Sequence, residues 1–420
     1  MSEVLTTSYK YIYMTSKEHS KLIRLRVRMR DLIDGDIFKS AVNTTMKRYP
    51  YFCVRLKRNG NRYVYEQNGA PVAVIRSQSG VALNCAQSNY HMLAFSWYDN
   101  RFTLDIFHGL TDGTGAYELM RTLLYYYCSQ RYALTLKGAG IRLFGDEIQP
   151  QEFENPVDNV RLPDAEGKKY STALNLVTAG GLENDTVKTV YSLAVPEREF
   201  MRFTSDNDGS PGTMVALLLS RAVAKLYPDC RDTIRVALCV NQRGALKAPL
   251  AHQCLVGAAM LEYKDRMRSL PFDRQATIYR GMVFAQTLEE TILAGVAVQK
   301  RLSERMQACK TDEERFAMAK NISHGAMRVQ TALVSYVGKA DYKEAEQYIR
   351  DFRTLTCAET PVLIEISAVN GRFVMDFIQC FSSPVYVSAF LSELDENGIT
   401  FDLQDVTPLE LPEICIFENK

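Results

Sequence analysis

The chain has 420 residues, a hydrophobic fraction of 46%, a charged fraction of 24% and a formal net charge of +1. This composition is typical of a globular protein, and the near-zero charge argues against nucleic acid or an anionic membrane as the main partner. No apolar stretch approaches the length of a membrane span, the first residues lack a signal-peptide pattern, and the ten cysteines form no CxxC pair. We therefore expect a cytoplasmic protein with reduced thiols, organised as two lobes rather than one core.

The N-terminal part of the chain combines one helix with two hairpins. Residues 33–52 carry apolar side chains at helical spacing, and a proline ends the pattern. Asn59-Gly60 lies between two short apolar stretches and predicts a hairpin turn, as does Asp99-Asn100 further on. In the strand after the second turn, alternate residues share one face: Phe102, Leu104, Ile106 and His108.

At the end of that strand the pattern changes from period two to helical. His108 and Asp112 stand four residues apart, and Gly113 and Gly115 follow. The apolar residues after the glycines recur at helical spacing: Ala116, Leu119, Met120, Leu123, Leu124 and Tyr127. This segment therefore predicts a strand, a tight glycine-containing turn and a helix.

Residues 145–185 are polar and show little periodicity. We interpret the stretch 151–185 as a linker or crossover. It would separate an N-terminal lobe, residues 1–150, from a C-terminal lobe, residues 186–420.

The C-terminal half begins with a predicted strand at 189–195. A helix is expected after Ser210, a candidate N-cap, because Pro211 suits the first helical position. A strand at 234–241 follows, and then a long helical stretch to about residue 306. The sequence TDEE from Thr311 is a capping box and predicts one more helix.

The chain contains an internal repeat of its first half. Residues 92–123 align without a gap on residues 363–394, with five identities in 32 positions. The turn Asp99-Asn100 falls on Asn370-Gly371, itself a strong hairpin signal, and the apolar positions of strands and helix largely coincide. We infer that each lobe contains the same hairpin–turn–helix unit.

The two copies differ in the residues able to do chemistry. Gln379 takes the place of His108, and Ser383 takes the place of Asp112. An imidazole is the natural general base near neutral pH, where such help is worth roughly 10²–10⁴-fold in rate. The alternative is a surface turn in which the histidine caps a carbonyl. A zinc site is less favoured, because no third ligand has suitable spacing.

The segment His108–Gly113, HGLTDG, matches the HxxxDG signature of the acyltransferase superfamily with the chloramphenicol-acetyltransferase-like fold. That superfamily includes non-ribosomal condensation domains, plant BAHD acyltransferases and alcohol acetyltransferases. The resemblance covers nearly the whole chain: residues 33–56 resemble the opening helix, Val240–Leu246 an arginine-bearing second-lobe segment, and residues 333–341 a further strand. It is nearest to the free-standing alcohol acetyltransferase-like branch. It implies an α/β fold of two similar lobes, a pseudo-dimer with a tunnel between them.

The resemblance also implies roles for single residues. His108 would take a proton from an acceptor hydroxyl or amine that attacks an acyl thioester. Asp112 would be structural and pair with Arg243, while Gly113 would permit the turn and keep the channel open. Ser335 is a candidate donor to the oxyanion or contact to the substrate. The donor would be acyl-CoA or a phosphopantetheine thioester on a carrier protein. No permanently bound cofactor, no metal and a monomer are expected.

The chain departs from the family pattern at Phe107, where many relatives carry a first histidine. No DFGWG-like segment is present, which argues against the plant branch. Three functions are therefore open: acyl transfer to a hydroxyl, amide formation from carrier-bound thioesters, and a catalytically silent binding protein. The intact His108, Asp112 and Gly113 favour an enzyme.

Overall fold

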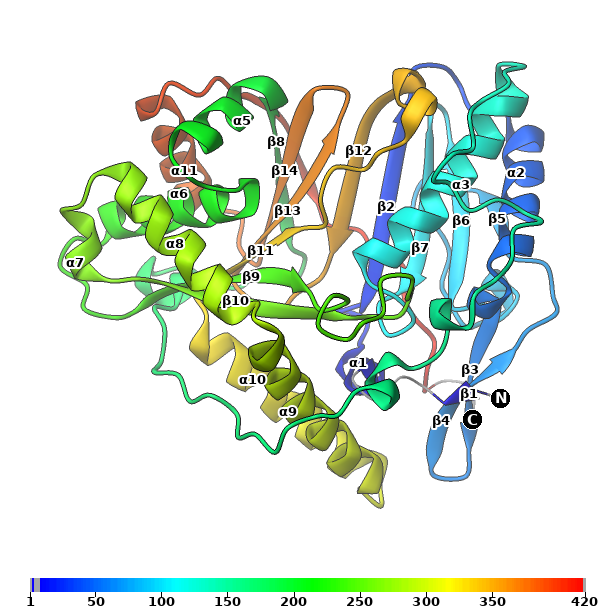
Figure 1. Ribbon diagram of the computed structural model, residues 1–420, viewed down its shortest axis with the longest axis horizontal. Coiled ribbons are helices and arrows are strands. Elements are labelled where there is room, and N and C mark those ends of the chain that lie inside the picture. Colours follow the sequence, from blue (N-terminus) through cyan, green and yellow to red (C-terminus); the bar gives the residue numbers. More distant parts are fainter. Residues whose placement is uncertain (1, 4–7, 418–420) are drawn as a thin grey trace.

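The computed structural model describes residues 2–3 and 8–417, whose strands form two large sheets and one small sheet (Figure 1). Residue 1 and residues 4–7, which belong to the stretch inspected for a signal peptide, lie outside the described residues. The small sheet has the order β1-β4-β3, and its strands are β1 (Ser2–Glu3), β4 (Arg62–Gln67) and β3 (Val54–Asn59). The β3–β4 pair is the hairpin predicted at Asn59-Gly60.

The first large sheet has the order β12-β2-β7-β6-β5. Its strands are β12 (Ile349–Thr356), β2 (Leu22–Met29), β7 (Arg101–Phe107), β6 (Leu93–Tyr98) and β5 (Val74–Arg76). The helices α2 (Gly35–Arg48) and α3 (Gly113–Arg131) run side by side along it (Figure 1). Their buried faces join the strands in one apolar core, because amphipathic helices bury the same side that the apolar spacing marks.

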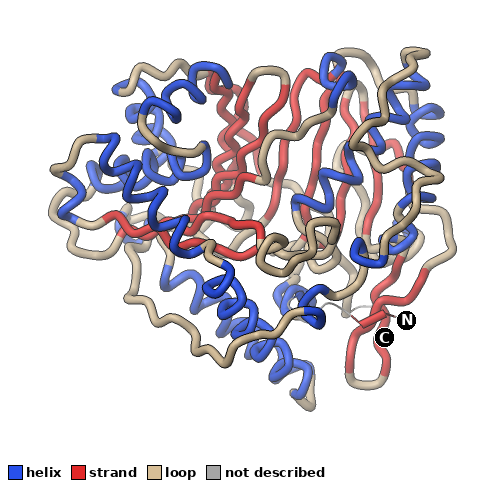
Figure 2. The backbone as a smooth tube through the Cα atoms, in the orientation of Figure 1, coloured by secondary structure: helices blue, strands red, loops and turns tan. Residues whose placement is uncertain are grey.

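The second large sheet has the order β10-β9-β11-β13-β14-β8-β15. Its strands are β8 (Thr189–Pro196), β9 (Ile234–Asn241), β10 (Val256–Tyr263), β11 (Ala332–Tyr336), β13 (Val362–Val369), β14 (Arg372–Gln379) and β15 (Asp402–Pro408). Among the helices that pack beside it are α5 (Glu197–Asp206), α6 (Pro211–Leu226) and α11 (Val385–Glu396). The two large sheets stand next to each other through the centre, with most helices outside them (Figure 2).

The long helical stretch predicted before residue 306 is wrong in its first part. β10 occupies Val256–Tyr263 and pairs antiparallel with β9 along its whole length. Its glycine and alanines gave no alternating apolar pattern, so only the long-range pairing makes it a strand. Helices follow: α7 (Asp265–Arg268), α8 (Phe272–Gln286) and α9 (Glu289–Ala308). Then α10 (Asp312–Val329) begins after the capping box at Thr311.

The internal repeat is confirmed as a structural repeat. The hairpin β6–β7 followed by α3 corresponds to the hairpin β13–β14 followed by α11, each in the predicted order. Both hairpin turns use a residue with positive φ, Asp99 at 52° and Asn370 at 50°. Such a backbone is tolerated by Asp and Asn, which explains why these residue types mark both turns.

The sheets do not follow the expected lobe boundaries at one strand. β12 lies in the C-terminal half of the sequence but pairs antiparallel with β2 in the first sheet. Near the other end of that lobe, the backbone of Leu83 bonds to Glu413 and Cys415. The expected linker contains loops, the 3₁₀-helix Pro156–Asn159 and the helix α4 (Leu176–Ala179). Segments from the C-terminal half therefore complete the first lobe.

Among the described residues, no single helix has the length and apolarity needed to cross a membrane, and the pair α8–α9 meets that test only jointly, across a 62° bend.

Candidate active site

His108 directly follows β7, where the pairing with β2 ends. Its backbone N–H donates to the Lys21 carbonyl at 2.9 Å, which extends the strand pairing by one residue. Its ring Nδ1 lies 3.1 Å from the carbonyl oxygen of Thr111. Because a carbonyl can only accept, Nδ1 carries the proton in this contact. In the neutral ring the other nitrogen, Nε2, is then the unprotonated one.

Two side chains from distant segments surround the imidazole. Tyr11, on the helix α1 (Lys10–Met14), stacks on the ring with 4.9 Å between centroids and 10° between planes. The Cys254 sulfur lies 3.6 Å from Nδ1. Burial by itself lowers the pKa of His108, but the Cys254 sulfur and the charge of Asp112 raise it, to about 9.

Asp112 does not bond to the imidazole but holds the turn. It caps α3 by accepting from the Gly115 N–H at 3.2 Å. Its carboxylate forms a bidentate ion pair with Arg243, with N–O distances of 2.8 and 2.9 Å, and both side chains are buried. It also accepts from the Leu255 N–H at 2.8 Å. The structure thus brings Asp112 and Arg243 together in one buried network.

Arg243 in turn orders the loop between β9 and β10. Its guanidinium donates to the carbonyl oxygens of Ala251 at 2.8 Å and Gln253 at 2.9 Å. The Thr111 hydroxyl donates to the His252 carbonyl at 2.6 Å. The loop that carries Cys254 is therefore fixed directly against the turn that carries His108.

The glycines of the motif allow close packing. A Cβ on Gly113 would lie 2.4 Å from a methyl carbon of Val337, and one on Gly115 would lie 2.4 Å from the His252 carbonyl oxygen. Neither glycine has a positive φ. Close approach, rather than a left-handed turn, is therefore the physical reason for glycine here. Phe107 is fully buried in the core of the first lobe.

Ser335 lies on β11 beside Glu365 of β13, in parallel register. Its hydroxyl lies near the Glu365 carboxyl and the Cys239 thiol and lowers the pKa of both groups. Thr356 also donates to Glu365, at 2.5 Å. Burial raises the pKa of Glu365 to about 7, against the opposing effect of these hydrogen bonds and of the His108 charge.

Tyr11, Cys254 and Glu365 were not identified from the sequence. Tyr11 and Cys254 offered no signal, since Cys254 meets His108 across 146 residues of chain. Glu365 offered one, because it is the single charged residue in an otherwise apolar strand, VLIEISAV.

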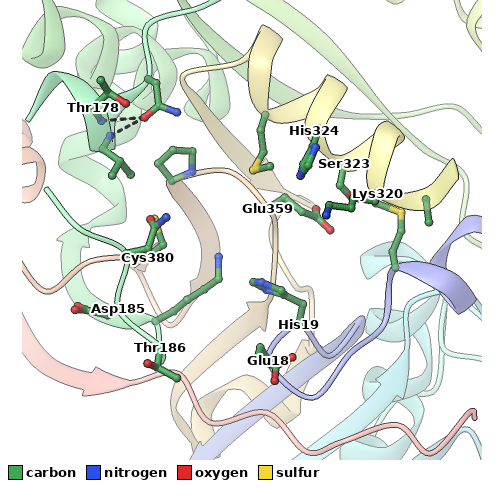
Figure 3. Close-up of a pocket in the computed structure, with 18 of the residues that line it drawn as sticks. Glu18, His19, Thr178, Asp185, Thr186, Lys320, Ser323, His324, Glu359 and Cys380 are labelled. Atoms are coloured by element: carbon green, nitrogen blue, oxygen red, sulfur yellow. Dashed lines mark hydrogen bonds between the residues drawn. The ribbon is translucent and has the colours of Figure 1, made fainter. Parts of the chain in front are cut away.

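Two cavities of about 750 and 740 Å³ flank this region. The first lies between α10, the segment before β2 and the loops before β13 and after β14. Its ionisable lining residues include His19, Lys320 and His324 and the carboxylates Glu18, Asp185 and Glu359 (Figure 3), together with Lys188. Tyr13 and Met14 of α1 also line it, next to the stacked Tyr11. The second cavity is lined by Gly109 and Leu110, which directly follow His108. Within residues 2–3 and 8–417, no group of three His, Cys, Asp or Glu could hold a metal.

No family model and no curated protein sequence matches the chain. Solved structures do match over nearly its full length. Polyketide synthase associated protein 5 from Mycobacterium tuberculosis aligns with a TM-score of 0.61 at 14% identity, covering 94% of this chain and 98% of that one. The condensation domain of the Monacolin K polyketide synthase MokA gives 0.59 at 10% identity, covering 94% and 96%. TRI101 of F. sporotrichioides, complexed with coenzyme A and T-2, gives 0.57 at 10% identity, covering 95% and 98%. Likeness at this level of identity is a likeness of fold.

Proposed function

Because the chain has the two-lobed chloramphenicol-acetyltransferase-like fold, we propose that it is an acyltransferase in which His108 is the general base. The acyl group would move from a thioester, acyl-CoA in the first instance, to a hydroxyl acceptor. The observation that carries this proposal is the bond from Nδ1 to the Thr111 carbonyl. In the neutral ring this bond leaves Nε2 with a lone pair at the end of a strand, and the backbone holds the ring in one orientation.

The proposed reaction is a single displacement through a tetrahedral intermediate. The acceptor oxygen attacks the thioester carbonyl while Nε2 of His108 takes its proton. The C–S bond then breaks, and the imidazolium returns the proton to the leaving thiolate. We propose that Ser335 donates to the oxyanion, which requires its hydroxyl to turn away from Glu365. Asp112 and Arg243 act only by holding the turn and the facing loop.

The first cavity is the proposed entrance for the donor. Its two lysines, Lys188 and Lys320, can pair with the phosphates of coenzyme A, and the carboxylates Glu18, Asp185 and Glu359 line the same cavity. A solved structure of the same fold, TRI101, is complexed with coenzyme A. No permanently bound cofactor takes part in this proposal.

Amide formation from a carrier-protein thioester is the second candidate. Condensation domains share the fold, and the charged residues that line the second cavity, Glu152, Glu154 and Asp158, are all acidic and suit an amine. A carrier protein would then be the partner.

Free-thiol release tests both candidates. Acyl-CoAs of increasing chain length and an acylated carrier protein are offered with panels of alcohols and amines. We expect thiol release that depends on the acceptor and rises with pH towards about 9, the pKa of His108. No acceptor-dependent release from any donor would favour the silent binding protein.

A further inference from the structure

The second cavity has a polar wall that the proposed mechanism does not use. Glu152, only 2% exposed, forms a bidentate pair with Arg48 at 2.8 and 2.9 Å. Arg142 approaches the same carboxylate to 3.1 Å. Burial raises the pKa of Glu152, but the hydrogen bonds from Arg48 and Tyr51 outweigh it and lower the pKa to about 2. Glu152 is therefore ionised and can only accept hydrogen bonds.

The negative charge of Glu152 determines which atoms of Tyr51 and His252 carry protons. Tyr51 donates its hydroxyl proton to Glu152 at 2.8 Å. The Tyr51 oxygen also lies 2.5 Å from Nδ1 of His252, and its only proton is already used. Nδ1 must therefore be the donor in this second bond. Burial lowers the pKa of His252 to about 3, so the ring is neutral and Nε2 carries no proton.

Nε2 of His252 is a hydrogen-bond acceptor with no partner in the described part of the chain, and the residue is 2% exposed. Its neighbour Gln253 repeats the situation. The Gln253 amide nitrogen donates to the Glu154 carbonyl at 2.7 Å, which fixes Oε1 as the opposite atom. That oxygen is also buried without a partner among the described residues. Buried acceptors left unpaired cost free energy, about 1–3 kcal/mol each.

Both residues line the second cavity, whose other walls restrict the ligand further. The aromatic lining residues are Tyr51, Phe52, Tyr65 and Phe153. The charged lining residues are all carboxylates, and Glu152 is neutralised by Arg48 and Arg142. The negative charge that disfavours a polyanion such as coenzyme A therefore comes from Glu154 and Asp158. Because the His252 carbonyl bonds to Thr111, this wall is attached to the turn that carries His108.

We propose that the second cavity is the acceptor site, and that it takes an amine with an aromatic body whose N–H groups donate to Nε2 of His252 and Oε1 of Gln253. The assignment of the ligand as acceptor rests on the second candidate of the proposed function, amide formation. The recognition itself does not, since it concerns binding alone. Tyr51 and Glu152 are positioning groups that fix the tautomer of His252.

Two matched probes test the recognition without turnover. Tyramine and 3-(4-hydroxyphenyl)propionate share a phenol ring and a two-carbon chain but end in an ammonium and a carboxylate. Their dissociation constants are measured by saturation-transfer difference NMR on the full chain. We expect tyramine to bind at least tenfold more tightly, as charged hydrogen bonds and an acidic wall require. Equal binding, tighter binding of the carboxylate or no saturable binding of tyramine would overturn the proposal.

Two substitutions at position 252 distinguish the contribution of Nε2 to binding from an effect on folding. In His252→Asn the amide can keep the bond to Tyr51, but the atom corresponding to Nε2 is gone. His252→Gln retains a polar atom near that position. We expect tyramine binding to weaken about tenfold in His252→Asn and less in His252→Gln, with unchanged melting curves as the check on folding. Equal tyramine affinity in wild type and His252→Asn would show that Nε2 holds only water and would overturn the proposal.

Failure of this inference and failure of the proposed function give different results. Thiol release that depends on His108, together with equal binding of tyramine and the propionate, would support the acyltransferase function and refute the amine site. If tyramine binds and His252→Asn weakens that binding, but no donor releases thiol, the amine site is supported as a binding site and the acyltransferase activity is refuted.

Discussion

Groups from three separate parts of the chain contact the imidazole of His108. Thr111 fixes the tautomer, Cys254 lies beside Nδ1, and Tyr11 covers one face of the ring. The histidine itself could be predicted, because it belongs to a short motif at a strand end. Its neighbours Tyr11 and Cys254 could not, because no periodicity or spacing connects residues that meet only through the fold.

Removing the sulfur beside His108 should change the pH dependence of acyl transfer. Catalysis needs the neutral imidazole, so the acid limb of kcat/KM lies at the His108 pKa, near 9 in the wild type. In Cys254→Ala the largest influence that raises the pKa is removed, while burial still lowers it, so the pKa falls. We expect the acid limb to move to lower pH by at least about one unit, measured as thiol release across pH 6–10.

Cys239→Ala is the control for that measurement, since Cys239 is also a free, partly buried thiol but lies beside Ser335 rather than beside the imidazole. Its acid limb should stay where it is in the wild type. An unchanged limb in Cys254→Ala would contradict the assigned effect of the sulfur.

Glu365 should make the stability of the protein fall as pH rises. Its pKa is raised from 4.5 to about 7 in the folded chain, so the folded state binds the proton more tightly than the unfolded state. Stability is therefore lost between about pH 4.5 and pH 7. In Glu365→Gln this loss is absent. At pH 8 the free energy of unfolding of the variant should therefore exceed that of the wild type by roughly 3 kcal/mol. Urea unfolding at pH 4.5 and pH 8 measures it; equal pH dependence in both proteins would contradict it.

At the scale of elements, the ion pair Asp112–Arg243 joins the start of α3 to the loop between β9 and β10. Asp112→Asn leaves the buried guanidinium without its counter-charge, which typically costs about 3–5 kcal/mol. We expect a lower melting temperature and reduced thiol release together. Arg243→Met in the same background should restore part of the stability but not the activity. A fully stable and active Asp112→Asn would refute this role.

The predicted elements were those with local signals. The turn Asp99-Asn100 and its repeat at Asn370-Gly371 need residues that tolerate positive φ, so the residue types indicate the hairpins. The helix α10 begins where Thr311 and Glu314 can satisfy each other's backbone N–H groups. The prediction was wrong at β10 because nothing in its own residues requires a strand, and only the pairing with β9 makes it one.

At the scale of the whole molecule, the chain returns from its second half to complete the first lobe. β2 has β12 on one side, paired from Ile23 to Met29. A fragment ending at residue 185 would lack this strand and expose a sheet edge. The boundaries predicted from composition could not reveal that β12 belongs to the first sheet, because strand order depends on long-range pairing and not on local sequence patterns.

We therefore expect residues 1–185 expressed alone to aggregate or to melt without a cooperative transition. Co-expression of residues 1–166 with 167–420, a break within the polar linker, should give a soluble complex with the wild-type circular dichroism spectrum. A cooperative unfolding transition of the isolated fragment 1–185, detected by calorimetry, would contradict the structural importance of β12.

The central claim is that His108 transfers the proton during acyl transfer. The most direct test compares wild type with His108→Gln, which introduces the residue found at the matching position, Gln379, of the second repeat. The measurement is the rate of acceptor-dependent thiol release from acyl-CoA at pH 9. The account predicts a loss of about 10²–10⁴-fold in kcat with an unchanged melting temperature. Equal rates in the two proteins would contradict it.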